Sequence, residues 1–571
     1  MMRAVLVCVS LLSPFATSLS PLSAQDAQYQ DIHYTLDDIR LTAEVASNPK
    51  VSGELFIPET ITVGQNTYTV TAIGDKAFKG CKALTAVVLP KTLERVYRSA
   101  FDGTGIMLNK ENWSEGCLWL DSILIATDKT IKPRFVVPVS TRLIAAGAFQ
   151  GNKVITRVDL PDGLTRIDHE TFRDCKNLQK VVIPLSVTSI GEEVFTGSGI
   201  YANENKWKKG ALILDDCLVA TNNTLPAKYI FKNKIPIRLI AERAFANRKN
   251  LQTVTIPASV TAIPTAAFYN CEKLVDVTIP ATVREVGNFA FYNCGLLKSA
   301  TLPSELQYLG MGVFYGCVNL KEQVLSNHLE AIGQATFFMC RAIKQLTLPN
   351  HLKRIGNGAF AGCSSLEAID LPQTLEFMGE QAFAGCAALR KVVIPVGVNS
   401  LPKQAFQGCS HLYRIDLPDG LYAIGEEALD GCIALEKINI PRSTFRIGVR
   451  AFHNCQQLRG IALVDHIHLI EEGAFMECKL LEDITLPASL QQLEKGAFAQ
   501  CISLRTLRLN ASLKSIGDGA FCQCRSLREV QWNDSLQTIG ADAFLECKNL
   551  RAPGIPSHIS VGKNAFKGCK N

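Results

Sequence analysis

Apolar residues recur in a fixed pattern along most of the chain. One period is the stretch from Leu389 to His411, with the sequence LRKVVIPVGVNSLPKQAFQGCSH. Leu389, Val392 and Ile394 alternate with polar residues, as in a half-buried strand, and Pro395 ends that strand because proline cannot donate to a ladder. Two apolar positions then follow on a return segment, and a phenylalanine, a glycine and a cysteine close the period. Each period therefore predicts one coil with a strand, a return and one large aromatic side chain.

The phenylalanine of the "AF" pair marks the phase of each period. It recurs from Phe78 to Phe566, Leu429 replaces it once, and every step from Phe245 to Phe544 is 23 residues. A constant period in this range, with leucines at fixed phases, is typical of a leucine-rich-repeat solenoid. The markers predict about 20 coils of 23 residues. We expect a mainly β fold with a parallel sheet on one face, short turns on the convex return, two hairpin inserts and no long helices.

The consensus L-x-x-V-x-I-P-x-x-V-x-x-I-G-x-x-A-F-x-G-C resembles the BspA-like leucine-rich repeats of bacterial surface and secreted proteins. The resemblance covers about Val51 to Asn571, and its matches include VVIPLSVTSIGEEVF (Val181 to Phe195) and ALEKINIPRSTFRIGVRAFHNC (Ala434 to Cys455). It implies a scaffold whose repeat carries no catalytic residues. It also implies adhesion to host matrix proteins or to other cells as the use of that scaffold.

The chain divides into three parts by pattern. Residues 1–24 contain one basic residue, an apolar run and a small-residue exit, which predicts a cleavable export signal too short to span a membrane. Residues 25–71 have no "AF" marker and predict an N-terminal β cap, and residues 72–571 form the predicted solenoid. The last coil shows neither a cap nor a sorting motif, so self-association through an uncapped C-terminal end is an alternative.

Two inserts interrupt the period at about residues 103–130 and 197–224. The segments "CLWL-DS-ILIA" and "ALIL-DD-CLVA" each place two apolar strands around a two-residue turn, which indicates a hairpin. Trp113, Trp119, Tyr201 and Trp207 lie in these inserts, and such aromatic residues are enriched at binding hot spots. They are candidates for binding a partner. The alternative, which we favour, is that each tryptophan packs its own hairpin.

The cysteines follow the same phase as the phenylalanines. Sixteen of the 20 cysteines lie three residues after a marker position and predict one column of thiols, a coil apart. A single column cannot converge on a metal ion as a tetrahedral site requires. We interpret the pairs as a structural ladder, with a few disulfides as the alternative: Phe360 and Cys363, Phe383 and Cys386, Phe406 and Cys409.

One variable position of each strand is expected to face solvent. Its residues are small or polar in many coils and predict a flat, accessible strip suited to an extended partner. A solvated face that tolerates β-forming residues is an equal alternative. The candidate contact residues, called the strip below, are Asp159, Thr255, Thr278, Thr301, Thr347, Asp370, Asp416 and Arg508.

Composition and motifs limit the function further. The net charge of +6 is spread over 571 residues, so nucleic acid is excluded as the main partner, and no later apolar run predicts a membrane span. We find no catalytic motif and expect no cofactor and no metal. The sequence predicts a non-enzymatic, secreted or surface-exposed bacterial protein that binds protein ligands, with the periplasm also open. A self-assembling coat component is the alternative, and a glycan-acting enzyme is a remote one.

Overall fold

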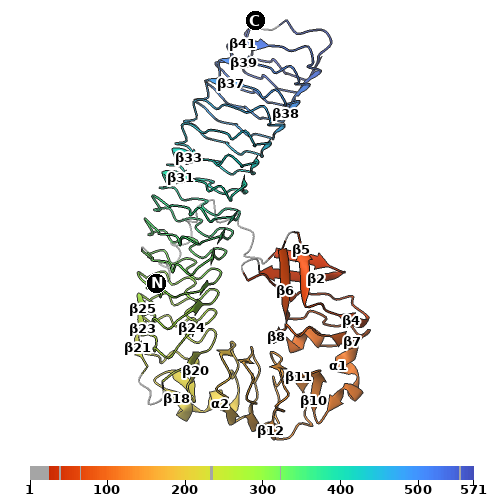
Figure 1. Cartoon of the computed structure of the whole chain (residues 1–571), viewed down its shortest axis with the longest axis vertical. Coiled ribbons are helices and arrows are strands. Elements are labelled where there is room, and N and C mark those ends of the chain that lie inside the picture. Colours follow the sequence, from red (N-terminus) through yellow and green to blue (C-terminus); the bar gives the residue numbers. More distant parts are fainter. Residues whose placement is uncertain are drawn as a thin grey trace, which may run out of the picture. The chain divides into compact units, whose positions relative to one another are not determined.

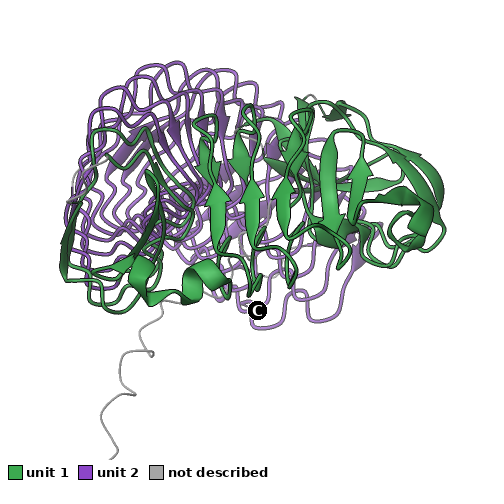
Figure 2. Ribbon diagram, turned by 90° about the horizontal axis from the view of Figure 1, so that it is seen from below, with its two compact units in different colours: residues 1–271 green, residues 272–571 purple. Residues whose placement is uncertain are grey.

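The computed structural model of the chain describes residues 25–37, 40–64, 66–231, 236–321, 323–551 and 554–570. The predicted export signal, residues 1–24, lies outside these residues. The chain is a mainly β solenoid of about 22 turns with about 23 residues per turn, which confirms the predicted fold class. It divides into two compact units, unit 1 (Met1–Cys271) and unit 2 (Glu272–Asn571), and each is described by itself (Figures 1 and 2).

Each coil of unit 1 contributes a strand to each of two sets. The first set, ladder 1, takes the residues just before the proline that ends the predicted strand. Its strands are β4 (Gly53–Phe56), β7 (Leu84–Val88), β12 (Arg134–Val136), β14 (Arg157–Asp159), β16 (Lys180–Val182), β21 (Lys228–Ile230) and β23 (Thr253–Thr255). The second set, ladder 2, lies on the return. Its two-residue strands are β8 (Arg95–Val96), β13 (Leu143–Ile144), β15 (Arg166–Ile167), β17 (Ser189–Ile190), β22 (Leu239–Ile240) and β24 (Ala262–Ile263).

The N-terminal segment of unit 1 forms a sheet of its own that merges with the coils. The sheet contains β1 (Gln25–Tyr29), β2 (Ile32–Asp37), β3 (Thr42–Val45), β5 (Thr60–Val63) and β6 (Asn66–Ile73). Strand β6 pairs antiparallel with β5 and parallel with both β3 and β8, so it joins this sheet to ladder 2. Strand β4 pairs in parallel with β7 of ladder 1. The predicted cap boundary at residue 71 stays a prediction, and β6 crosses it.

Unit 2 repeats the two ladders. Ladder 2 has a strand in every coil, whereas ladder 1 has strands in some coils and isolated bridges in others. Its strands in ladder 1 are β25 (Asp276–Thr278), β31 (Lys391–Val393), β33 (Arg414–Asp416), β37 (Asp483–Thr485), β39 (Thr506–Arg508) and β41 (Glu529–Gln531). Its strands in ladder 2 are β26 (Glu285–Val286), β27 (Tyr308–Leu309), β28 (Ala331–Ile332), β29 (Arg354–Ile355), β30 (Phe377–Met378), β32 (Ser400–Leu401), β34 (Ala423–Ile424), β35 (Arg446–Ile447), β36 (Leu469–Ile470), β38 (Gln492–Leu493), β40 (Ser515–Ile516), β42 (Thr538–Ile539) and β43 (Ser560–Val561).

Ladder 2 is the main feature that the sequence did not predict. We expected only turns on the return, yet its strands pair in parallel from coil to coil, as Arg354 does with Phe377 and Ile355 with Met378. Only one residue of each pair carries a buried apolar side chain, so the alternation is too short to be seen in the sequence. The backbone hydrogen bonds of the return are thereby satisfied between coils.

The core of unit 2 is a stack of the marker phenylalanines. The ring centroids of Phe360 and Phe383 lie 5.2 Å apart with an interplanar angle of 6°, and those of Phe383 and Phe406 lie 5.4 Å apart with an angle of 4°. All three side chains are buried. The corner two residues after each marker has a positive φ, a region that favours glycine: Gly385 has a φ of +71°. Other coils keep this conformation without glycine, as at Met339 and Gln500.

Candidate functional site

The strip lies where the alternation of ladder 1 predicts it. Six of its eight residues are exposed: Thr255, Thr278, Thr301, Thr347, Asp370 and Arg508. The other two are half-buried, because the carboxylate of Asp159 contacts Arg157 Nε at 2.8 Å and that of Asp416 contacts Arg414 Nε at 2.8 Å. Their inward neighbours, such as Val254 and Ile415, are buried. The outward placement of the strip is established, and partner binding there stays a prediction.

The same outward position has a different character in the two units. In unit 1 it is mostly apolar and exposed, with Phe56, Val88, Val136 and Ile230 each more than half exposed. In unit 2 it is mostly threonine, aspartate or another polar residue, and Val324 and Val393 are the large apolar residues there that are exposed. The predicted flat polar strip therefore describes unit 2 better than unit 1.

Both inserts are hairpins, as predicted, but they are built into the solenoid. In the first, β10 (Cys117–Leu120) pairs antiparallel with β11 (Ile123–Thr127), and in the second β19 (Ala211–Leu214) pairs with β20 (Cys217–Thr221). The inner strand of each hairpin then pairs in parallel with a ladder 2 strand, β11 with β13 and β20 with β22. Each insert thus supplies one extra turn, which explains about 22 turns against 20 markers.

Two matching arginines hold the coils on either side of these inserts together. Arg142 and Arg238 occupy the same place, directly before β13 and β22. The guanidinium of Arg142 donates to the carbonyl oxygens of Lys91 and Leu93, about 50 residues earlier in the chain, at 3.1 and 2.8 Å. The guanidinium of Arg238 donates to the carbonyl oxygen of Val187 in the same way. In a regular coil a hydroxyl donates to the equivalent carbonyl oxygens, as Thr374 does to Asn350 and Leu352. Each arginine makes such bonds across the insert.

The tryptophans of the inserts are held by their own hairpins. Trp113 follows η3 (Lys110–Asn112) on β9 (Trp113–Ser114), and its indole N–H donates to the carbonyl oxygen of Met107 at 3.0 Å. Trp207 on β18 (Trp207–Lys208) makes the equivalent bond to the carbonyl oxygen of Tyr201 at 2.9 Å and packs edge-on against that ring. Both indoles and Trp119 are half-buried. This packing supports the structural interpretation, and a binding role for these residues stays a prediction.

A hydroxyl replaces the thiol where the chain leaves a coil to enter an insert. Thr104 and Ser198 stand three residues after Phe101 and Phe195, where most coils have cysteine. Their side chains cap the short helices α1 (Gly105–Leu108) and α2 (Gly199–Ala202), accepting from the backbone N–H of Met107 and Tyr201. A hydroxyl is a strong N-cap acceptor and a thiol is a weak one. The break in the cysteine pattern therefore marks where the helix begins.

The remaining thiols form the predicted column, and each one has a partner. The Sγ–H of Cys363 donates to the carbonyl oxygen of Phe337 at 3.1 Å, and that of Cys386 to Phe360 at 3.2 Å. The same bond to the preceding coil recurs along unit 2. Burial raises the pKa of the Cys363 thiol to about 12, so the thiol stays protonated and unreactive. The described cysteines are all free. The thiols therefore link successive coils and do not form a chemical site.

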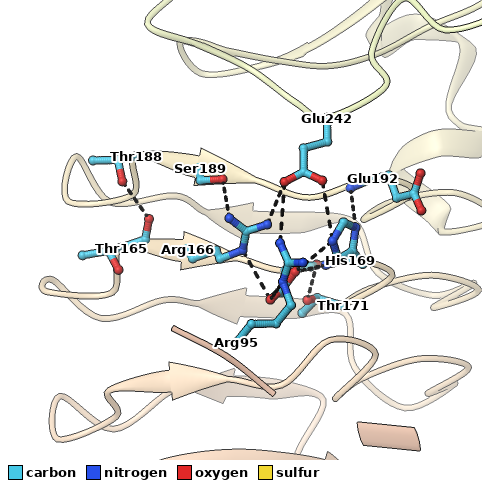
Figure 3. Close-up of polar contacts among 10 residues, drawn as sticks. Arg95, Thr165, Arg166, His169, Thr171, Thr188, Ser189, Glu192 and Glu242 are labelled. Carbon is cyan, nitrogen blue, oxygen red and sulfur yellow. Dashed lines mark hydrogen bonds and ion pairs between the residues drawn. The ribbon is translucent and has the colours of Figure 1, made fainter. Parts of the chain in front are cut away.

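A buried group of charges in unit 1 joins residues from before, between and after the two inserts. We call Arg95, Arg166, Asp168, His169 and Glu242 the charge cluster. Arg95 Nε contacts Asp168 Oδ2 at 3.1 Å, and Arg166 Nη2 contacts Glu242 Oε1 at 2.7 Å (Figure 3). His169 Nε2 lies 3.5 Å from one oxygen of each acid. The side chain of Asp168 is 3% exposed and that of Glu242 is 8% exposed, so both carboxylates are out of water.

Each arginine of the charge cluster reaches across an intervening coil. Arg95 and Asp168 are 73 residues apart, and the coil between them presents the small residues Ala145 and Ala146. Arg166 and Glu242 are 76 residues apart, and Arg166 also donates to Ser189 Oγ on the intervening strand β17 at 2.9 Å (Figure 3). The cluster thus ties together the coils on both sides of the second insert.

The charges of the cluster set one another's ionisation. Burial acts to raise the pKa of Asp168, but the positive charges of Arg166 and Arg95 outweigh it and lower that pKa. Glu44 on β3 faces Arg95 from the N-terminal sheet, and burial raises the pKa of its carboxyl. Burial also raises the pKa of Tyr97 to about 12, and its ring stacks on His169 with centroids 5.9 Å apart. These charges are buried and paired, which is typical of ion pairs with a structural role.

The charge cluster has no local signature in the sequence. Its members come from three separate coils, so the sequence analysis missed it. One signal was present: Asp168 occupies the position of the "IG" glycine, where a side chain normally has no room. At Gly356, for example, a Cβ would lie 2.6 Å from the backbone of the preceding coil. This signal is not specific, because Glu471 and Glu494 occupy the same position in coils whose ladder 2 strands still pair.

The described residues contain neither a metal-binding cluster nor a membrane-spanning helix. Among the described residues, no group of three or more His, Cys, Asp or Glu side chains is placed to hold a metal ion. In that same part of the chain, no helix has the length and apolar character needed to cross a membrane.

Comparison with known proteins places the chain in a family. The family model described as "BspA type Leucine rich repeat region (6 copies)" matches residues 56–119, 130–205, 238–348, 330–459 and 446–571. A search of curated proteins found no match.

Several solved structures are similar. A leucine-rich repeat protein from Bacteroides ovatus is 21% identical, with 90% of this chain and 94% of that chain covered and a TM-score of 0.32. A leucine-rich cell surface protein from Faecalibacterium prausnitzii is 17% identical, with 96% and 99% covered and a TM-score of 0.34. A leucine-rich repeat protein from Eubacterium ventriosum is 20% identical, with 57% and 84% covered and a TM-score of 0.35. Because the family model matches well over half of its length, the chain belongs to the BspA-type leucine-rich-repeat family.

Proposed function

We propose that the protein is a non-enzymatic binding protein, exported to the cell surface or the medium, that uses its repeat scaffold for adhesion. The main support is that different residues of each coil serve the core and the surface. The repeated leucines, phenylalanines and cysteines go to the core, while the outward position of ladder 1 stays exposed over many consecutive coils. Family membership agrees with a scaffold for protein interactions. Protein ligands, including host matrix proteins and proteins of other cells, are the proposed partners.

We propose the strip of unit 2 as the contact surface for a protein partner. Thr278, Thr301 and Thr347 are small, exposed and on the same face, so an extended segment would approach the sheet without steric hindrance. The strands there pair in parallel, and the face is polar with few charges. Asp370 and Asp416 would add charged contacts within the same strip.

Binding to a panel of purified extracellular-matrix proteins tests this function. The chain from residue 25 is immobilised, and a strip variant carries Thr278→Arg, Thr301→Arg and Thr347→Arg. A matched control carries Gln492→Arg, Gln537→Arg and Thr538→Arg, which are exposed positions on the ladder 2 side. We expect the strip variant to lose binding and the control to keep it. Absence of binding to every panel member by the unaltered chain would contradict the adhesion proposal.

The inserts provide a second arm of the same experiment. A variant with Trp113→Ala and Trp207→Ala removes both indoles and their hydrogen bonds to Met107 and Tyr201. If the hairpins only pack, binding falls no more than the stability of unit 1 does. A loss of binding with unchanged unfolding would move the contact surface from the strip to the hairpins.

Export and assembly are tested on the natural product. We expect the protein to be recovered from the cell surface or the medium with an N-terminus near Gln25, because residues 1–24 have the pattern of a cleavable signal. Recovery of the full-length chain only from the cytoplasm would contradict export. Light scattering at high concentration separates a monomeric adhesin from a self-assembling coat component, since only the latter forms large species.

A further inference from the structure

A row of cations runs along unit 2 where each coil enters ladder 1. The residue directly after the leucine that opens each coil is exposed and lies on neighbouring coils at the same level; for example, the backbone N–H of Arg528 donates to the carbonyl oxygen of Arg505 at 3.0 Å. In unit 1 this position holds Thr85, Thr156, Gln179 and Gln252. In unit 2 this position holds mostly charged residues, which we call the edge row. They are Lys298, Lys321, Lys344, Glu367, Arg390, Tyr413, Glu436, Arg459, Glu482, Arg505, Arg528 and Arg551.

Two of the three acids of the edge row contact a neighbouring arginine of the row. Glu367 lies 4.0 Å from Arg390, and Glu482 lies 3.4 Å from Arg505. Beyond Glu482 the row contains arginine alone, at Arg505, Arg528 and Arg551. Arg505 is paired with Glu482, whereas Arg528 and Arg551 have no acid in the row beside them, so these neighbouring guanidinium groups repel one another.

Two more arginines lie near this end of the row in the chain. Arg508 is the outward residue at the end of β39, in register with Gln531 of β41, and Arg525 precedes Arg528 by three residues. Both are exposed. The arginine cluster is Arg505, Arg508, Arg525, Arg528 and Arg551. Among the described residues, Arg508, Arg525, Arg528 and Arg551 form no ion pair within 4.0 Å, and Glu482, Asp483 and Glu529 are the acids beside them in the strands.

We propose that the arginine cluster is a binding site for a sulfated polysaccharide. Arginine presents a rigid fork of donors that fits sulfate oxygens in pairs. The row offers about one cation per coil, spaced roughly 4.7–4.9 Å as in neighbouring strands. One sugar unit lengthens a polysaccharide chain by a similar step, so a chain with a sulfate on each sugar would meet one arginine per coil. Such a ligand relieves the repulsion among the arginines.

Other polyanions fit this surface less well. Single-stranded nucleic acid is bound through aromatic side chains on which its bases stack. Between residues 479 and 551 the described chain has no exposed Phe, Tyr or Trp; Trp532 is half-buried and packs edge-on against Phe544 at 6.0 Å. Double-stranded DNA carries about one charge per 1.7 Å of its axis, a far denser array than the cluster offers. The arrangement therefore favours a flat polyanion that carries no bases and fewer charges per unit length than double-stranded DNA. Binding at this site does not depend on the proposed binding of proteins.

A defined heparin octasaccharide is the probe, measured against the chain from residue 25 immobilised on a surface. A cluster variant carries Arg508→Gln, Arg525→Gln and Arg528→Gln. A control with the same change of net charge carries Lys79→Gln, Lys273→Gln and Lys437→Gln, which are exposed, outside the edge row and far apart in the sequence. We expect the unaltered chain to bind, salt to weaken the binding, and the cluster variant alone to lose on the order of 10-fold in affinity.

Two competitors and one structural check complete the test. An oligodeoxynucleotide and an oligoglutamate of the same charge are offered in place of the octasaccharide, and we expect both to bind more weakly. Equal binding of either competitor, an equal loss in the control variant, or no binding by the unaltered chain would overturn the proposal. Unfolding of the cluster variant is expected to match that of the unaltered chain, because the three side chains are exposed.

Discussion

Units 1 and 2 hold their successive coils together in different ways. Unit 2 keeps the 23-residue period as far as Phe544, and its coils are linked by backbone ladders, stacked phenylalanines and thiol hydrogen bonds. Unit 1 contains both inserts, and charged side chains take over where hairpins open ladder 2: Arg142, Arg238 and the charge cluster. All four coils that lack the column cysteine belong to unit 1, and they carry Thr104, Asn152, Ser198 and Arg248 in its place. An irregular solenoid therefore needs long polar side chains where a regular one uses short buried groups.

Alkaline pH should separate the two units most strongly. Fourteen of the 19 described free cysteines lie in unit 2. Burial raises the pKa of Cys363 and Cys409 to about 12, against about 8.5 in an unfolded chain. The folded state thus keeps protons that the unfolded state releases, so stability from the thiols is complete below about pH 8.5 and is lost as the pH rises toward 12. The loss is about 1.4 kcal/mol per thiol and pH unit.

Hydrogen exchange followed by mass spectrometry across this pH range measures each unit separately. We expect peptides of unit 2 to lose protection at a lower pH than peptides of unit 1. A variant with Cys363→Ala and Cys409→Ala should resist alkali better, relative to its own stability at neutral pH. Simultaneous loss of protection in both units would refute the link between thiol burial and alkaline stability.

Removing one acid of the charge cluster should destabilise unit 1 next most strongly. Asp168→Ala leaves Arg95 and Arg166 to share the single carboxylate of Glu242 in a buried site, and breaking a buried pair costs about 3–5 kcal/mol. The matched control is Asp416→Ala, which removes the exposed contact with Arg414 and should cost less than about 1 kcal/mol. Denaturant unfolding gives both values, and equal losses would show that the cluster does not hold the coils of unit 1 together.

Changes to a single thiol should have a smaller effect in unit 2. Cys386→Ala removes the hydrogen bond to Phe360 and a little volume, at about 1–3 kcal/mol. Cys386→Ser keeps a donor and should cost less than Cys386→Ala if the hydrogen bond matters more than the volume. The half-buried Cys522 outside the column serves as the control. A larger loss in Cys386→Ser would indicate that the thiol acts only as an apolar filler.

The smallest effect we expect is a gain of stability at Glu44. Burial raises the pKa of this carboxyl, so its contribution to stability is complete at acid pH and is lost as the pH rises above its usual value of about 4.3. Glu44→Gln removes this loss and should raise the Tm of unit 1 slightly at neutral pH, with no gain at acid pH. Calorimetry at two pH values checks this, and a Tm that falls at neutral pH would mean that the charge of Glu44 stabilises Arg95.

The regular parts of the fold were predictable because they depend on a single repeated set of contacts. Phe360, Cys363 and their equivalents recur at one phase, and the hairpins carry a local pattern of two apolar strands and a short turn. Ladder 2 escaped prediction because its strands have two residues, too few for an alternation. The charge cluster escaped because Arg95 and Asp168 are 73 residues apart. The outward position of the strip was predictable from alternation, whereas binding there depends on a partner that the chain does not encode.

The thiol hydrogen bonds of unit 2 all run in one direction, from each coil to the one before it. Every coil therefore offers the same acceptor that it requires from its predecessor, and a duplicated 23-residue segment would fit between any two of them. Unit 2 can lengthen or shorten in evolution by whole repeats. Unit 1 cannot, because Arg95 and Arg166 each span one intervening coil and an added coil would separate them from Asp168 and Glu242. The charge cluster therefore fixes the number of coils between its members.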